Sequence, residues 1–196
     1  MREFVFDIDY PEGSAPGQKL FEVATPPDTV GVGGCIAPDE FWRIEQYSGA
    51  PDALDTTDET SLEKLLAVES VADAACDGTV HVEILERSGE KCEVYYHLKD
   101  ISGCESVQTL AVEYLGPDVL FELERKKDRD TWSVLMPSDD DVGLLYDAIQ
   151  ACLRPELQFT FDHVGQASDR RMDLFAKKNL PAEQREALVA AVKNGY

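Results

Sequence analysis

Residues 91–164 read KCEVYYHLKDISGCESVQTLAVEYLGPDVLFELERKKDRDTWSVLMPSDDDVGLLYDAIQACLRPELQFTFDHV, and this stretch alternates between two hydrophobic spacings. Segments with apolar side chains at every second position are typical of strands; they are residues 91–98, 119–124, 131–136 and 156–163. Segments with helical spacing are residues 106–115 and 140–153. The order strand–helix–strand–strand–helix–strand predicts an α+β fold of ferredoxin-like order, with two helices on one face of a four-stranded antiparallel sheet.

The first 90 residues carry similar signals. The expected elements are a strand over 3–10, a hairpin of 29–36 with 40–47, a helix over 52–68 and a strand over 80–86 that turns into 91–98. A shift of 90 residues places Trp42 on Trp132 and Leu54 on Leu144. Few other positions match, so the sequence leaves open whether the first half is a degenerate repeat of the second.

These signals divide the chain into three parts. We expect an N-terminal α+β half over 1–90, a ferredoxin-like half over 91–165, and a linker with a helical segment over 166–196.

The net charge of −21 restricts the partners of the chain. Such a chain is repelled by phosphate backbones and by anionic membrane surfaces. Acidic residues are spread throughout and Lys is scarce, which is typical of a halophile's cytoplasm, where molar salt screens self-repulsion. Residues 166–196 alone carry +2 and the preceding residues −23. This asymmetry is typical of a part that approaches a polyanion, with a short exposed connector as the alternative.

The cysteines and histidines predict no metal site, because no C-x-x-C or H-x-x-x-H spacing occurs. Five cysteines without short pair spacing do not predict a disulfide framework either. The hydrophobic pattern around Cys92 and Cys152 predicts that both pack in the core. Cys35 follows two glycines, and Cys104 precedes a helix N-terminus, which lowers a thiol pKa. These two are the candidates for redox or ligand sensing, with ordinary packing as the alternative.

No catalytic arrangement is recognisable in the sequence. Residues 31–34 are glycine-rich, but no helix comes after them, so they do not form a phosphate-binding loop. We therefore predict neither an enzyme nor a bound cofactor.

Residues 180–196, LPAEQREALVAAVKNGY, predict a helix with Pro181 at its first position and Gly195 after its end. This segment resembles the helix that opens the C-terminal helix-turn-helix domain of haloarchaeal bacterio-opsin activator-type transcription regulators. The stretches MREFVFDIDY and TWSVLMPSDDDVGLLYD and the Gly103-Cys104 pair look like the sensor region of the same proteins.

The resemblance implies the sensor region of a cytoplasmic DNA-binding regulator, which couples an unknown small-molecule or redox signal to the helix-turn-helix. The implied DNA-proximal helix carries Gln184, Arg185 and Lys193. The helix that reads the major groove comes second in such domains, so we expect a truncated or shortened relative. Dimerisation stays open, and no membrane contact is expected. The alternative is a stand-alone effector-binding or protein-interaction module without DNA binding.

Overall fold

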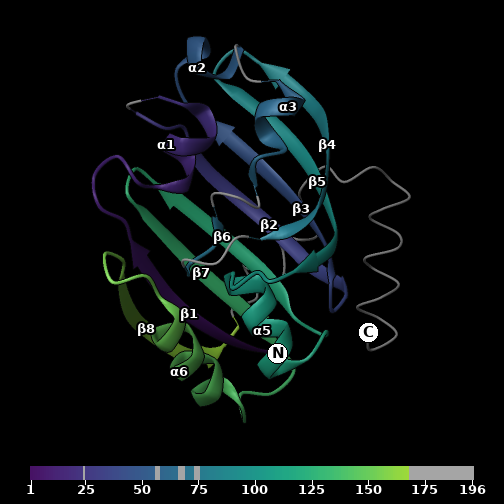
Figure 1. The fold of residues 1–196 in the computed structure, drawn as a ribbon, viewed down its shortest axis with the longest axis vertical. Helices are drawn as coiled ribbons and strands as arrows, with labels where there is room; N and C mark the ends of the chain where they lie inside the picture. Colours follow the sequence, from purple (N-terminus) through teal and green to yellow (C-terminus); the bar gives the residue numbers. More distant parts are fainter. Residues whose placement is uncertain (24, 56–57, 66–68, 73–75, 168–196) are drawn as a thin grey trace.

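An antiparallel β-sheet extends through the whole described chain (Figure 1). The computed structural model describes residues 1–23, 25–55, 58–65, 69–72 and 76–167. Within them, eight strands are ordered β4-β5-β3-β2-β6-β7-β1-β8. The strands are β1 (Arg2–Asp9), β2 (Asp28–Ala37), β3 (Glu40–Ser48), β4 (Asp77–Ser88), β5 (Lys91–Ser102), β6 (Leu120–Lys126), β7 (Arg129–Met136) and β8 (Gln158–Gln166). The helices described are α1 (Pro16–Phe21), α2 (Pro51–Asp55), α3 (Glu59–Leu62), α5 (Val107–Leu115) and α6 (Val142–Cys152).

The two halves of the sheet share the same plan. The first half holds β1 to β4 and the second half β5 to β8. If each strand of one half is exchanged for its counterpart in the other (β1 for β5, β2 for β6, β3 for β7, β4 for β8), the strand order of the sheet is the same, listed from the opposite edge. The β2–β6 pair lies at the centre of this symmetry. The first strand of each half has moved into the other half: β1 lies between β7 and β8, and β5 lies between β3 and β4.

This arrangement shows that the predicted ferredoxin-like α+β fold is wrong. That fold requires β5 to pair with β7 and β8 in a sheet of four strands. Both edges of β5 are instead occupied by β3 and β4, and β8 pairs with β1. The fold is an eight-stranded antiparallel sheet with a few short helices.

The three predicted hairpins are confirmed, because each depends on neighbouring residues. β2 pairs with β3, β4 with β5, and β6 with β7. Gly89 has a φ of +52° in the β4–β5 turn, a conformation that glycine adopts without a Cβ penalty. The pairings that join separate hairpins connect residues far apart in the sequence, and alternation alone does not specify them.

The helices agree with their predicted positions to different degrees. Helix α5 begins after Ser106, whose side chain accepts a hydrogen bond from the Thr109 backbone N–H, and it ends at Gly116. Instead of one helix over 52–68, the structure has α2 and α3. The second begins after Asp58, whose carboxylate caps the Ser61 N–H. Aspartate favours the position before a helix over its interior, so Asp58 starts a new helix.

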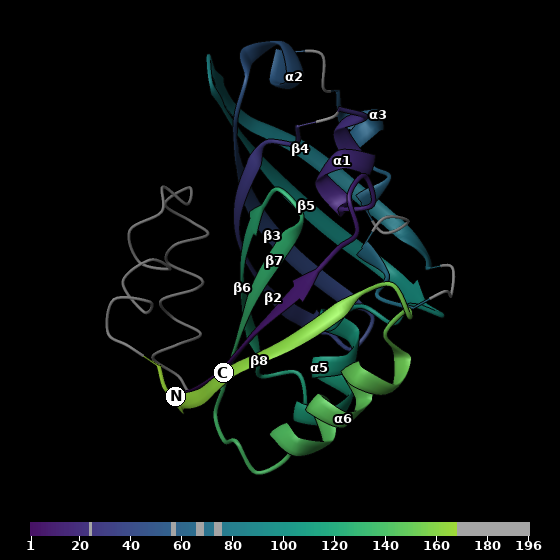
Figure 2. The same ribbon diagram turned by 90° about the vertical axis from the view of Figure 1, so that its left-hand side faces the viewer.

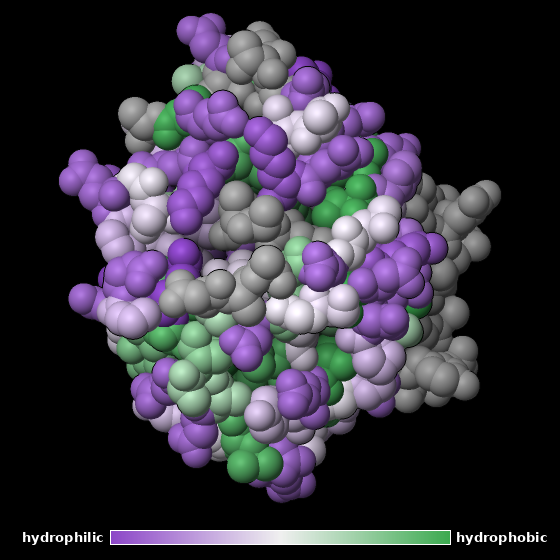
Figure 3. Space-filling view, in the orientation of Figure 1, coloured by the Kyte–Doolittle hydropathy of each residue, from purple (hydrophilic) through white to green (hydrophobic). Residues whose placement is uncertain are grey.

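One face of the sheet carries the main core. Figure 2 shows α1 to α3 near one end of the sheet and α5 and α6 near the other, on the same side. The side chains of Phe4, Phe6 and Ile8 from β1 are fully buried there, with Val94 and Tyr96 from β5. Figure 3 shows hydrophilic residues across much of the helix-bearing side and hydrophobic ones gathered near α5 and α6. This face also buries a group of charged side chains.

Candidate functional site

The buried charges lie over two glycines of β2. Gly31 pairs with Glu45 of β3, and Gly33 pairs with Arg43. A Cβ on Gly31 would lie 3.1 Å from Glu45 Cγ, and one on Gly33 would lie 2.8 Å from Arg43 Cγ. The missing side chains therefore leave the space that Arg43 and Glu45 occupy.

Two arginines share one carboxylate at the centre of this group. Glu69, in the connection between α3 and β4, accepts hydrogen bonds from Nη2 of Arg43 at 3.1 Å and from Nη2 of Arg125 at 3.1 Å. Arg43 also bonds Glu45. Arg125 donates two hydrogen bonds to the Asp130 carboxylate, from Nε at 2.7 Å and from Nη2 at 2.8 Å. Burial alone would raise the pKa of Glu69, but Arg43 and Arg125 outweigh it and lower that pKa.

Three tyrosines extend the group at both ends. Tyr10 donates to Asp130 at 3.2 Å. Tyr47 donates to Glu45, and its hydroxyl lies 2.6 Å from that of Tyr96. Burial raises the pKa of each of these phenols above its usual range, so all three are neutral hydrogen-bonding groups.

We call these eight side chains the charge network; they are Tyr10, Arg43, Glu45, Tyr47, Glu69, Tyr96, Arg125 and Asp130. With both guanidiniums and all three carboxylates ionised, it carries one excess negative charge. It connects β3 and β5 with β6 and β7, so it joins the two sides of the central β2–β6 pair. In the described part of the chain, Nη1 of Arg125 and Nε1 of Trp132 have no hydrogen-bond partner.

A disulfide bond between Cys76 and Cys104 lies beside the charge network. Cys76 immediately precedes β4, and Cys104 lies in the loop between β5 and α5. Upstream of Cys76, the Val71 N–H donates to the Glu105 carbonyl at 2.9 Å. The bond therefore ties the connection that carries Glu69 to the loop that leads into α5.

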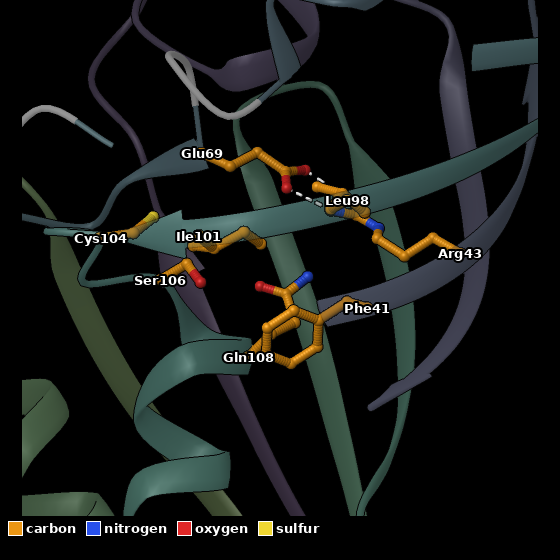
Figure 4. A pocket seen from close by; sticks show the side chains of 8 residues that line it. All are labelled: Phe41, Arg43, Glu69, Leu98, Ile101, Cys104, Ser106 and Gln108. Carbon is orange, nitrogen blue, oxygen red and sulfur yellow. Dashed lines mark hydrogen bonds and ion pairs between the residues drawn. The ribbon is translucent and has the colours of Figure 1, made fainter. Parts of the chain in front are cut away.

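Two cavities adjoin Cys104. An inner cavity of about 20 Å³ is lined by Phe41, Arg43, Glu69, Leu98, Ile101, Cys104, Ser106 and Gln108 (Figure 4). An outer groove of about 340 Å³ is lined by Pro38, Ile101, Ser102, Gly103, Cys104, Thr109, Val112, Glu113 and Pro117. Ile101 and Cys104 border both spaces.

Comparison with models of known protein families identifies the family of the chain. A model of the haloarchaeal domain family described as HVO_2928_N, N-terminal, matches residues 3–170. The chain belongs to this family. The match covers the described strands and helices apart from the first residue of β1, and it includes the charge network and both cysteines of the disulfide. No protein of curated function matches the chain.

In this HVO_2928_N family member, the residues predicted for sensing have different environments. Cys104 is in the disulfide. Cys35 is a free thiol on β2 that donates to the Ala37 carbonyl at 2.9 Å. Burial, together with Asp118 and Asp39, raises the pKa of Cys35 to about 11, which keeps it protonated and weakly nucleophilic at neutral pH.

Three further predictions concern the DNA-proximal helix, metal binding and membrane contact. The predicted DNA-proximal residues Gln184, Arg185 and Lys193 lie outside the described residues. Within the described ranges, no group of three or more His, Cys, Asp or Glu side chains is placed to hold a metal ion. None of the described helices is long and apolar enough to cross a membrane.

Sequence reasoning missed the charge network and the disulfide. The network had a readable signal, because Phe41, Arg43, Glu45 and Tyr47 share one face of β3 by simple alternation. Charged residues between two aromatic core positions, opposite a glycine-rich strand, indicate buried ion pairs. The disulfide had no such signal, since its two cysteines are 28 residues apart.

Proposed function

We propose that the chain is the sensor and regulatory region of a haloarchaeal DNA-binding transcription regulator, which passes a redox signal to a C-terminal helix-turn-helix. The family match supports this order of parts, because the family is an N-terminal domain that ends at residue 170 here. The segment that resembles the helix-turn-helix comes after it, at residues 180–196.

The observation that carries the proposal is the disulfide between Cys76 and Cys104. A disulfide is a bond that a change in thiol redox state makes or breaks. This one joins two segments that contact the charge network and the outer groove. Its reduction releases a covalent constraint on the connection that carries Glu69, and Glu69 pairs with Arg43 on β3 and with Arg125 on β6.

The route to the C-terminal segment runs through the sheet. Arg125 and Asp130 belong to β6 and β7. β7 pairs with β1, and β1 pairs with β8, the last strand before the C-terminal segment. A rearrangement of Glu69 is therefore transmitted through three adjacent strands to Gln166.

A second function, a stand-alone effector-binding module, is favoured by the outer groove. Its volume of about 340 Å³ falls in the range of small-molecule sites. The two functions differ in the consequence of binding, since only the regulator couples the site to DNA.

The test uses the chain extended by a complete helix-turn-helix and a promoter fragment selected from genomic DNA by binding. Fluorescence anisotropy in molar KCl compares oxidised with dithiothreitol-reduced protein. We expect a change of about tenfold or more in affinity, within the usual range of coupling between sites. Cys104→Ser is expected to bind like the reduced protein in both conditions. Cys152→Ser removes a free thiol outside the disulfide and is expected to switch normally.

Equal affinity of the oxidised and reduced protein would refute the redox regulator. Saturable binding of a small molecule in the groove, with no effect on DNA affinity, would support the effector-binding function.

A further inference from the structure

The outer groove and the inner cavity are adjacent spaces with one common wall. Ile101 and Cys104 line both. Cys104 is the member of this wall that a covalent bond holds in place, through Cys76. Hydrogen bonds also hold the chain around it: Thr109 Oγ1 donates to the Cys104 carbonyl at 2.8 Å, and the Val71 N–H donates to the Glu105 carbonyl at 2.9 Å. The disulfide adds a covalent restraint to this wall between the two spaces.

The inner cavity contains a polar group without a partner. Gln108 of α5 is only 6% exposed, and it makes no hydrogen bond with the residues that the structure describes. Figure 4 shows its amide directed into the cavity between Phe41 and Ile101. Polar groups at such a position are normally hydrogen-bonded. The amide is therefore placed to bond an occupant of the cavity, either water or a ligand.

Arg43 and Gln108 also line a second hollow of about 10 Å³, together with Gly33 and Trp132. The Trp132 indole N–H has no partner among the described residues. Each hollow is closed in this structure to anything much larger than a water molecule. A larger ligand enters the inner cavity from the groove only after the wall at Cys104 has moved.

The charges around both spaces favour a cationic ligand. Glu113 lies in the groove, and Asp39 and Asp118 act on the thiol of Cys35 at the same end of β2. The charge network beyond the inner cavity has one negative charge in excess. Arg43 is a cation in the lining of the inner cavity, but Glu45 and Glu69 pair with it. The excess carboxylate charge and the Gln108 carbonyl therefore favour an ammonium group over an anion. The prolines, Val112 and Ile101 of the groove contact an apolar body.

From these observations we infer that the groove and the inner cavity form one binding site for a small amphipathic organic amine, and that the Cys76–Cys104 disulfide closes its inner part. The inference rests on the proposed function, because it names the ligand class and the regulation of the same site. Opening requires a small dithiol: the S–S bond breaks, two cysteine thiols form, and the dithiol loses two protons and two electrons as it closes to a cyclic disulfide.

The test measures binding of three molecules of similar shape by ligand-observed NMR in molar KCl: isoamylamine, isoamyl alcohol and isovalerate. The protein is the 196-residue chain, oxidised or reduced with dithiothreitol. We expect isoamylamine to bind the reduced form about tenfold more tightly than the oxidised form, with weaker binding of the alcohol and none of isovalerate. The Cys76→Ser/Cys104→Ser variant provides a second open form and is expected to match the reduced protein without dithiothreitol.

Two substitutions locate the site. Gln108→Leu keeps the size of the side chain and removes the amide, so we expect about a tenfold loss of isoamylamine affinity, as for a lost hydrogen bond to a charged group. Glu113→Gln is expected to weaken the amine and leave the alcohol unchanged. Glu90→Gln, in the exposed β4–β5 turn, is the matched control.

Three results would overturn the inference: no saturable binding of the amine by the reduced protein, binding of isovalerate as tight as that of the amine, or equal amine binding in both redox states. None of them bears on the promoter assay, so a redox-dependent change in DNA affinity would still support the proposed function.

Discussion

Replacement of Arg125 by methionine tests whether the charge network holds the sheet together. Arg125 is 1% exposed, and its guanidinium bonds both Asp130 and Glu69. Methionine fills most of the volume but leaves Asp130, also 1% exposed, as a buried carboxylate without a counter-ion. Removing one partner of a buried ion pair costs about 3–5 kcal/mol. For a chain of this size, that loss corresponds to a fall in melting temperature of roughly 6–20 °C.

The measurement is urea denaturation in molar KCl, monitored by the fluorescence of the tryptophans, of which Trp132 is 4% exposed. The double variant Arg125→Met/Asp130→Leu removes both charges of the pair and is expected to recover most of the lost stability. Arg129→Met removes an ion pair with Asp9 in which the arginine is 54% exposed, and little change is expected. A loss for Arg125→Met below about 1 kcal/mol, or no recovery in the double variant, would show that the network contributes little.

Four further outcomes are expected. The folded-state pKa of Glu69 is lowered, so the stability that its carboxylate contributes is complete above its unfolded pKa of about 4.3 and is lost as pH falls through the folded pKa. The free energy of unfolding in urea should therefore fall below about pH 4, and it should fall less steeply in Glu69→Gln. Alkylation of Cys35 by iodoacetamide, detected by mass spectrometry, should be slow at neutral pH and rise towards pH 11; rapid labelling at pH 7 would contradict the raised pKa of this thiol. Gly33→Ala places a Cβ 2.7 Å from the Trp42 carbonyl oxygen and should cost about 1–3 kcal/mol in urea melts, whereas Gly143→Ala in α6 meets nothing within 4 Å and should stabilise by up to about 1 kcal/mol. Because the net charge is −21, the melting temperature should rise between dilute buffer and molar KCl, and an unchanged melt would contradict the halophilic interpretation.

The sequence predicts elements of this fold much better than their partners. Each hairpin was readable because its turn brings adjacent segments together within a few residues. The choice of β3 and β4 as the neighbours of β5 was not readable, since β1 and β5 present similar alternating faces. Which of two similar strands enters a sheet depends on packing across the whole core, and a periodicity of two carries no such information.

The candidate site was predicted only in part. Cys104 was singled out from its position before a helix, but its partner Cys76 lies 28 residues away and is brought close only by the pairing of β4 with β5. Glu69 has no sequence signal at all. It lies in a connection between elements, and its role depends on two arginines that the fold places on different strands.

The exchange of first strands between the halves has a mechanical consequence. A pull on the chain beyond Gln166 loads β8, and the hydrogen bonds that resist it belong to β1 at the opposite end of the sequence. From β1 the load passes to β7 and then to β6, on which Arg125 holds the arginine–carboxylate contacts. The first and last of the described strands therefore form one tether, and tension on β8 is carried by β1.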